Sequence, residues 1–202
     1  MIRFPPSSTT RRSLEANAEV DAAWAAVLGS VRTAQLLLQR ITLSDLPDIE
    51  RMHDDAQGMA TLGGLRSAAQ SRRSIDAWIA HWDEHGFGLW IARDAETGAF
   101  AGRGGVQHTV VGGRAEVEIA YGFLPAFWGR GLATEVAAAS VRAGFETLGL
   151  ADLVCFTLAA NRASQHVMQK VGFKFEREVQ HASLPHLLYR LAATEWRNAA
   201  RR

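Results

Sequence analysis

The sequence has little of three features that would restrict its function. It contains a single cysteine, Cys155, in 202 residues, which excludes an internal disulfide. Cys155 lies in the strand-like apolar run LVCFTL, where we expect a small buried hydrophobic side chain rather than a nucleophile. No uninterrupted apolar run approaches the roughly 18 residues that a membrane span needs. These absences predict a soluble protein without a membrane partner, and we place it in the cytoplasm.

Concentrated positive charge is also missing. The chain has 22 Lys and Arg against 21 Asp and Glu, a net charge of +1, and no basic run exceeds two residues. A nucleic-acid partner therefore gains no electrostatic support, and a small, partly charged ligand fits better. A composition that is 48% hydrophobic and 21% charged is ordinary for a soluble protein, and the length predicts one main domain.

The first 32 residues are predicted to form an extension to a domain that spans residues 33–202. The opening MIRFPPSSTTRRS is similar to a transit peptide in having no acid, but Glu15 and Glu19 follow at once, so we expect a disordered tail. Apolar residues at helical spacing then predict a helix within residues 13–31. They are Val20, Trp24, Val27, Leu28 and Val31. This apolar stripe must pack on the core or on a second subunit, which makes a homodimer one of two expected arrangements.

Strand and helix signals alternate along the rest of the chain. Strands are predicted at residues 34–40, 87–94, 100–110, 114–125, 153–158, 172–178 and 184–191. Helices are predicted at residues 44–56, at 74–86, from 132 to about 148, and from Asn161. Ser44 or Asp45 is the expected N-cap of the first helix, and Gly86 is expected to end the second. The fold class is α+β or α/β, with one mixed, mostly antiparallel sheet flanked by helices.

The stretch AFWGRGLATEV places two glycines just before a predicted helix. The first N–H groups of a helix starting near Leu132 have no intrahelical partner, and the helix dipole places about half a positive charge there. Gly129 and Gly131 would let a phosphate approach the backbone, and Arg130 adds a charged donor. The pattern is neither GxxxxGK[ST] nor GxGxxG, since Thr134 stands at the third glycine. A tight turn without a ligand is the alternative.

The segments EVEIAYGFLPAFWGRGLATEV and NRASQHVMQKVGF resemble the GNAT acetyltransferases, and within them the branch that includes the ribosomal-protein N-terminal acetyltransferases. The resemblance runs from Thr33 to Leu191 and includes LLLQRITLSDLPDI, EHGFGLWIARDAETGAFAGRGGV and SLPHLLYRL. It implies a GNAT-like fold and an enzyme that moves an acetyl group from acetyl-CoA to a primary amine by direct attack in a ternary complex. A non-catalytic acyl-CoA-binding or interaction module is the alternative.

The resemblance also implies a cofactor site. In the family, the pattern [Q/R]-x-x-G-x-[G/A] wraps the pyrophosphate of acetyl-CoA, and here it falls on residues 128–133 with Trp128 in the polar position. The preceding strand, here residues 121–123, holds the pantetheine arm and the acetyl carbonyl by backbone hydrogen bonds, and a later helix supplies an asparagine and a small polar residue that reach the cofactor. The implied cofactor-binding residues are Tyr121, Gly122, Phe123, Gly129, Arg130, Gly131, Leu132, Ala133, Thr134, Asn161 and Ser164. Asn161 could equally serve only as the N-cap of its helix.

The acid and base of the reaction must also be found. Many relatives carry a tyrosine seven residues after that asparagine, but this chain has Met168. Ser164 is then the nearest candidate for the catalytic acid, and a small residue in the first turn of its helix is the alternative. An amine attacks the thioester as its free base, yet a lysine-like ammonium with a pKa near 10.4 is neutral in only about one molecule in 2,500 at pH 7. A carboxylate that takes a proton is therefore expected nearby.

Two glutamates of the strand RAEVEIAYGF could supply that carboxylate. The period of two puts Glu116 and Glu118 on one face of the strand. Glu118 matches the glutamate of the family, which implies that it is the base, whereas Glu116 would help to attract a cationic substrate. A solvated strand face is the alternative for both.

The segment HWDEH fits the HxxEH zinc pattern, with two imidazoles four residues apart on one helical face. Gly86 ends that helix, and no later helix offers an acidic third ligand. The remaining histidines, His53, His108, His166, His181 and His186, show no ligand spacing. We therefore expect no metal cofactor, and histidines near a helix C-terminus that the dipole favours. The identity of the acceptor amine is left open by the sequence, because loops around residues 56–73 and 181–185 would decide it.

Overall fold

The computed structural model describes residues 28–199, and the part of the expected N-terminal helix before residue 28 lies outside this range. The described chain forms one eight-stranded sheet in the order β1-β2-β3-β4-β5-β6-β8-β7, flanked by helices. Neighbouring strands are antiparallel except β5 and β6, which run parallel. The predicted fold class is confirmed.

All seven predicted strands are present, and one more precedes them. The strands are β1 (Ser30–Arg32), β2 (Leu36–Arg40), β3 (Leu89–Asp94), β4 (Phe100–Val111), β5 (Arg114–Phe123), β6 (Asp152–Leu158), β7 (Lys174–His181) and β8 (Leu184–Ala192). The helix expected through Val31 is wrong at its end, because Val31 lies in β1 opposite Leu38. A three-residue edge strand is too short to show a period of two. The domain division at Thr33 stays a prediction, although β1 extends the sheet to Ser30.

The helices begin and end close to their sequence signals. They are η1 (Leu43–Asp45), α2 (Leu46–His53), α3 (Ala56–Met59), α4 (Ala68–His85), η2 (Pro125–Phe127), α5 (Leu132–Arg142) with the π-helical turn η3 (Ala143–Thr147), α6 (Arg162–Lys170) and α7 (Ala193–Ala199). The N-cap of α2 is Asp45, and Gly86, with φ 72°, is the C-cap that follows α4. Helix α4 begins before the predicted residue 74, because Ser67 and Gln70 form a capping box.

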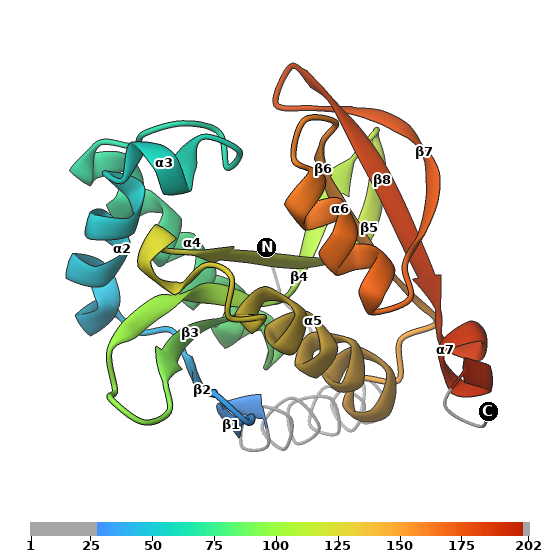
Figure 1. Ribbon diagram of the computed structural model, residues 1–202, viewed down its shortest axis with the longest axis horizontal. Coiled ribbons are helices and arrows are strands. Elements are labelled where there is room, and N and C mark those ends of the chain that lie inside the picture. Colours follow the sequence, from blue (N-terminus) through green and yellow to red (C-terminus); the bar gives the residue numbers. More distant parts are fainter. Residues whose placement is uncertain (1–27, 200–202) are drawn as a thin grey trace, which may run out of the picture.

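The helices cover both faces of the sheet (Figure 1). A Cβ added to Gly122 of β5 would lie 2.8 Å from side-chain atoms of Met52 and Leu62, so α2 and the segment after α3 pack against that face. A Cβ added to Gly104, opposite Tyr121, would lie 3.1 Å from Val136 of α5, on the other face. Large buried side chains from α4 and from the first strands fill the core beneath the helices.

Cys155 is buried in β6 and carries a free thiol, as predicted. Burial raises the pKa of this thiol, which keeps it protonated.

None of the described helices combines the length and the apolar character that crossing a membrane requires.

Candidate active site

The edge of β5 that faces β6 is largely unpaired. β5 and β4 are joined over ten registered pairs, from Gly102 and Phe123 to Val111 and Arg114. β5 and β6 share one registered pair in the described structure, Glu118 with Val154. Backbone groups of β5 beyond this pair can therefore bind an extended ligand as a strand would. The segment predicted to hold the pantetheine arm, residues 121–123, lies there.

The glycine loop joins this strand to α5, which begins at Leu132 as predicted. Gly129 and Gly131 have φ values of 77° and 82°, which glycine adopts without strain. Apart from the glycine and its two chain neighbours, no atom of the described residues lies within 4 Å of a Cβ added at either position. The first backbone N–H to bond back to the cap is that of Glu135, to the Gly131 carbonyl at 3.1 Å. The amides of residues 132–134 therefore point out of the helix end, where an anion such as a pyrophosphate fits.

Arg130 fastens the loop to β3. Its guanidinium donates to Asp94 at 2.7 Å and lies over the ring of Phe127. The Thr97 backbone N–H, followed by Arg130 itself, holds the pKa of Asp94 at about 2, so the Asp94 carboxylate is charged at physiological pH. A phosphate bound by Arg130, as the sequence predicts, would share the guanidinium with Asp94.

Trp128 has a role that the sequence pattern did not suggest. Its indole N–H donates to the Phe123 carbonyl at 2.8 Å, while about half of its surface remains exposed. The tryptophan thus fixes the start of the loop against the end of β5. It also occupies the Phe123 carbonyl, one of the backbone groups predicted to hold the cofactor.

Glu118 lies in a buried polar cluster next to the end of the β5–β6 pairing. The residue is 8% exposed, and its carboxylate accepts a hydrogen bond from Gln107 Nε2 at 3.0 Å. Burial raises the pKa of Glu118, while the Gln107 hydrogen bond and the charge of Arg103 act in the opposite direction. A carboxylate with these properties is more basic than an exposed one and can accept a proton from an amine or from water.

Arg103 and Gln107 were not found from the sequence. In the β4–β5 register Gln107 is opposite Glu118 and Arg103 is opposite Gly122. The buried Arg103 guanidinium lies over the ring of Trp78, and its Nε has no hydrogen-bond partner in the described part of the chain. Burial, together with the nearby charge of Arg66, lowers the pKa of Arg103 to about 10. Only the strand register could have placed these residues beside Glu118.

Glu116 is in a different situation. Arg190 of β8 donates to both carboxylate oxygens of Glu116, at 2.7 and 3.0 Å, and also bonds Asp152 and Glu176. The hydrogen bonds that Arg190 donates to these carboxylates, above all to Glu116, raise the pKa of Arg190. Glu116 is therefore held in an ion-pair network rather than on the solvated face considered as an alternative.

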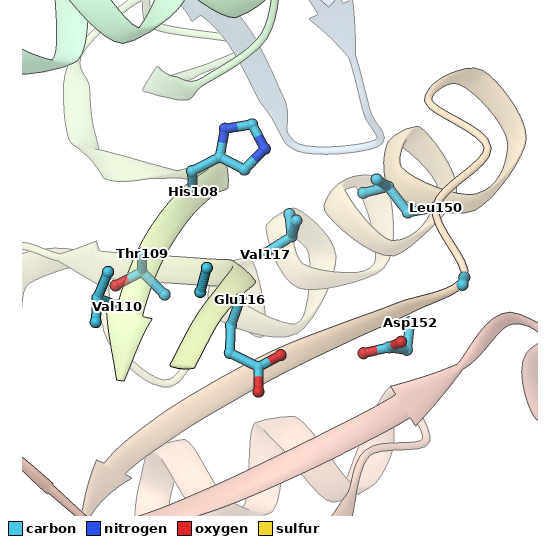
Figure 2. Close-up of a pocket in the computed structure, with 9 residues that line it drawn as sticks. His108, Thr109, Val110, Glu116, Val117, Leu150 and Asp152 are labelled. Carbon is cyan, nitrogen blue, oxygen red and sulfur yellow. The ribbon is translucent and has the colours of Figure 1, made fainter. Parts of the chain in front are cut away.

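An open groove of about 700 Å³ lies beside Glu116, between the ends of the β4–β5 hairpin and the start of β6 (Figure 2). Its lining residues are His108, Thr109, Val110, Ala115, Glu116, Val117, Leu150, Ala151 and Asp152. None of the residues predicted to bind the cofactor lines it. The groove is thus distinct from the β5 edge and the glycine loop.

A phenol reaches Ser164 from the strand rather than from the helix. The Tyr121 hydroxyl lies 3.0 Å from Ser164 Oγ, and Asn161 Oδ1 accepts the Ser164 backbone N–H at 3.1 Å. Asn161 is the N-cap of α6, as the sequence allowed, and Met168 is buried in the core. Burial raises the pKa of Tyr121, so its hydroxyl stays protonated. The sequence interpretation used Tyr121 only for its backbone and therefore missed this pair.

The chain is similar in sequence to a family model of acetyltransferases and to two proteins from Bacillus subtilis. The family model described as "Acetyltransferase (GNAT) domain" matches residues 35–174. "Uncharacterized N-acetyltransferase YoaA" from Bacillus subtilis is 28% identical over 148 residues, which cover 72% of this chain and 83% of that protein. "Uncharacterized protein YkkB" from the same organism is 27% identical over 166 residues, which cover 77% and 94%.

Solved structures show the same similarity. An acetyltransferase from Agrobacterium tumefaciens superposes with a TM-score of 0.72 at 26% identity, covering 80% of this chain and 93% of that one. A ribosomal L7/L12 α-N-protein acetyltransferase, RimL, in complex with coenzyme A superposes with a TM-score of 0.64 at 14% identity, covering 81% and 97%. At that identity the likeness is one of fold alone.

Proposed function

The chain belongs to the GNAT acetyltransferase family, whose general activity is acetyl transfer from acetyl-CoA to an amine, and we propose that here the amine attacks directly in a ternary complex beside Glu118. The main support for this proposal is that the pairing of β5 with β6 stops at Glu118. This places a buried carboxylate where the free strand edge begins. The backbone of β5, the glycine loop and the amides at the start of α5 would hold the cofactor, which supplies the activated acetyl group.

The charges around Glu118 favour a neutral amine. Arg103 lies close enough to Glu118 to lower the pKa of that carboxyl, and Arg66 adds a second positive charge near Arg103. A protonated amine entering this cluster meets like charge, which lowers its pKa. Glu118 can then take the amine proton directly or through an ordered water. The observed pairing of Glu116 with Arg190 favours Glu118 over Glu116 for this step.

We assign the protonation of the leaving thiolate to the Ser164 and Tyr121 hydroxyls. A coenzyme A thiol with a pKa near 8.5 leaves with only modest help. As Ser164 Oγ gives its proton to the thiolate, it can take the proton of the Tyr121 hydroxyl, 3.0 Å away, and Tyr121 is then reprotonated from water. The pair would take the place of the tyrosine that many relatives carry on this helix, where this chain has Met168.

Replacing Tyr121 with phenylalanine should lower kcat about tenfold and leave the acetyl-CoA affinity nearly unchanged, a smaller loss than the ~10²–10⁴ of a full general acid. Steady-state kinetics with Ser164→Ala and the double variant would show non-additive losses, because the two hydroxyls act together. Tyr189→Phe, which alters the other tyrosine of the chain, is the matched control. A normal kcat in Tyr121→Phe beside a slow Ser164→Ala would remove the phenol from the mechanism.

The activity is tested by supplying acetyl-CoA and a panel of amines that contains peptide N-termini, lysine, polyamines and aminoglycosides. We expect thiol release that depends on the amine and on the enzyme concentration. Acetyl-CoA binding without thiol release for any amine would instead support the non-catalytic binding module.

Leu62, which packs against Gly122, lies in the segment 56–73 that is expected to select the acceptor.

Three finer predictions accompany this function. We propose a cytoplasmic location, no nucleic-acid partner, and cover of the N-terminal apolar stripe by the core or by a second subunit. Size-exclusion chromatography with light scattering distinguishes the two arrangements of that stripe.

A further inference from the structure

Three histidines outside the proposed reaction meet where the end of α4 lies against β4. His81 and His85 are four residues apart on α4, and His108 lies on β4. One ring nitrogen of each lies within 4.8 Å of the other two. The sequence offered no third ligand, because an acidic residue was sought on a later helix. The fold instead supplies a histidine from a strand.

The hydrogen bonds of His81 fix its tautomer. Nε2 accepts the backbone N–H of His108 at 3.0 Å, so in the neutral ring Nδ1 carries the proton and donates it to the Phe87 carbonyl at 2.8 Å. An Nδ1–H held by a carbonyl is the usual support of a histidine whose Nε2 binds a metal. The imidazoles of His85 and His108 have no hydrogen-bond partner within residues 28–199, although Glu84 lies 3.8 Å from His85.

We propose that His81, His85 and His108 bind one divalent first-row transition ion, such as Zn²⁺. Imidazole nitrogens suit ions of this class, at about 2.0–2.1 Å, which puts two ligands of a tetrahedral ion roughly 3.4 Å apart. The three ring centroids already lie 4.4–5.4 Å apart, so binding would require side-chain rotations that turn one nitrogen of each ring toward the ion. The ion would displace the hydrogen bond from the His108 N–H to His81.

Access and coordination number fit the same proposal. His108 is exposed, and in Figure 2 its imidazole points away from the Glu116 and Asp152 carboxylates. Three imidazoles leave a fourth position for water or for Glu84, as in open zinc sites. The bound ion would connect α4 to β4 at the residue next to Gln107, which donates to Glu118. It would therefore stabilise the folded state by binding that state alone.

Zinc titration of the full chain tests the site. The full chain is prepared without a histidine tag, and bound metal is removed with EDTA. It is then titrated with ZnCl₂ in a calorimeter, without acetyl-CoA. We expect one ion per chain and a rise in Tm. His85→Ala and His108→Ala should each weaken binding at least about tenfold, because even the outer partners of metal ligands are worth 10–100-fold. His166→Ala, an exposed histidine of α6, should bind as the parent does.

Several outcomes would overturn the proposal. They are no binding heat and no Tm rise in the parent chain, an unchanged affinity in both cluster variants, or a loss of binding only in His186→Ala, which alters the separate His181–His186 pair. Tm values measured without metal show whether each variant is folded, and His85→Gln and His108→Gln replace an alanine variant that melts early. Since neither acetyl-CoA nor turnover enters the measurement, its result is independent of the proposed acetyl transfer.

Discussion

Replacing Glu118 with glutamine is expected to slow acetyl transfer at pH 7 by the ~10²–10⁴ typical of general base catalysis, with no change in acetyl-CoA affinity. The amide has the shape of the carboxyl, and its oxygen can still accept the hydrogen bond from Gln107 Nε2. It cannot take a proton from the amine or from water. Steady-state rates and calorimetric binding of acetyl-CoA separate the two effects.

The pH profile gives this variant a signature. Glu118 acts as a base only when it is deprotonated, so kcat/KM should fall as the pH drops through its pKa. Burial raises that pKa, which puts the acid limb above the position of an ordinary carboxyl near 4.3. The deficit of Glu118→Gln should shrink at high pH, where the amine is free without help. An α-amino acceptor, with a pKa near 7.7–8.0, should recover at lower pH than a lysine.

Glu116→Gln is the matched comparison. It removes the charge that Arg190 contacts with two hydrogen bonds. It should therefore lower the Tm and leave the rate of acetyl transfer close to that of the parent enzyme. A near-normal rate in Glu118→Gln beside a crippled Glu116→Gln would transfer the role to Glu116. Two active variants would mean that neither glutamate is the base and that the amine loses its proton to bulk water.

The parts of the site that could be predicted from the sequence depend on local signals. The alternation in RAEVEIAYGF predicted β5, and the helix start at Leu132 followed from the glycines before it. The N-cap at Asn161 followed from the chemistry of a single residue. Each of these signals is contained in a stretch of about ten residues. Over that length, local backbone geometry is enough to relate the sequence to the structure.

The parts that were missed depend on contacts between distant residues. Tyr121 and Ser164 are separated by 43 positions, and His108 reaches His81 across 27. Gln107 faces Glu118 only because of the register of the hairpin between them. Strand register and helix placement are set by packing of the whole core, and no window of the sequence contains that information. The Arg190 pairing that engages Glu116 is of the same kind, since it joins β8 to β5.

Replacing Gly131 with aspartate is expected to weaken acetyl-CoA binding well beyond tenfold, which is more than ~1.4 kcal/mol. The added carboxylate would lie at the cap of α5, where the helix end favours an anion, and would repel the phosphates that this site is proposed to hold. The substitution also forces a side chain into φ 82°, which costs roughly 1–2 kcal/mol of folding stability. Calorimetric affinity must therefore be compared between folded variants.

Gly113→Asp separates charge at the anion site from backbone strain. Gly113 has φ 74° and open space around an added Cβ, as Gly131 does, but it lies in the turn at the opposite end of β5. It should lose similar stability and keep its acetyl-CoA affinity. Gly131→Ala, which adds strain without charge, should fall between the parent and Gly131→Asp in affinity. If Gly131→Asp folds and binds acetyl-CoA as tightly as Gly113→Asp, the phosphates do not lie at the start of α5, and the loop is a tight turn without a ligand.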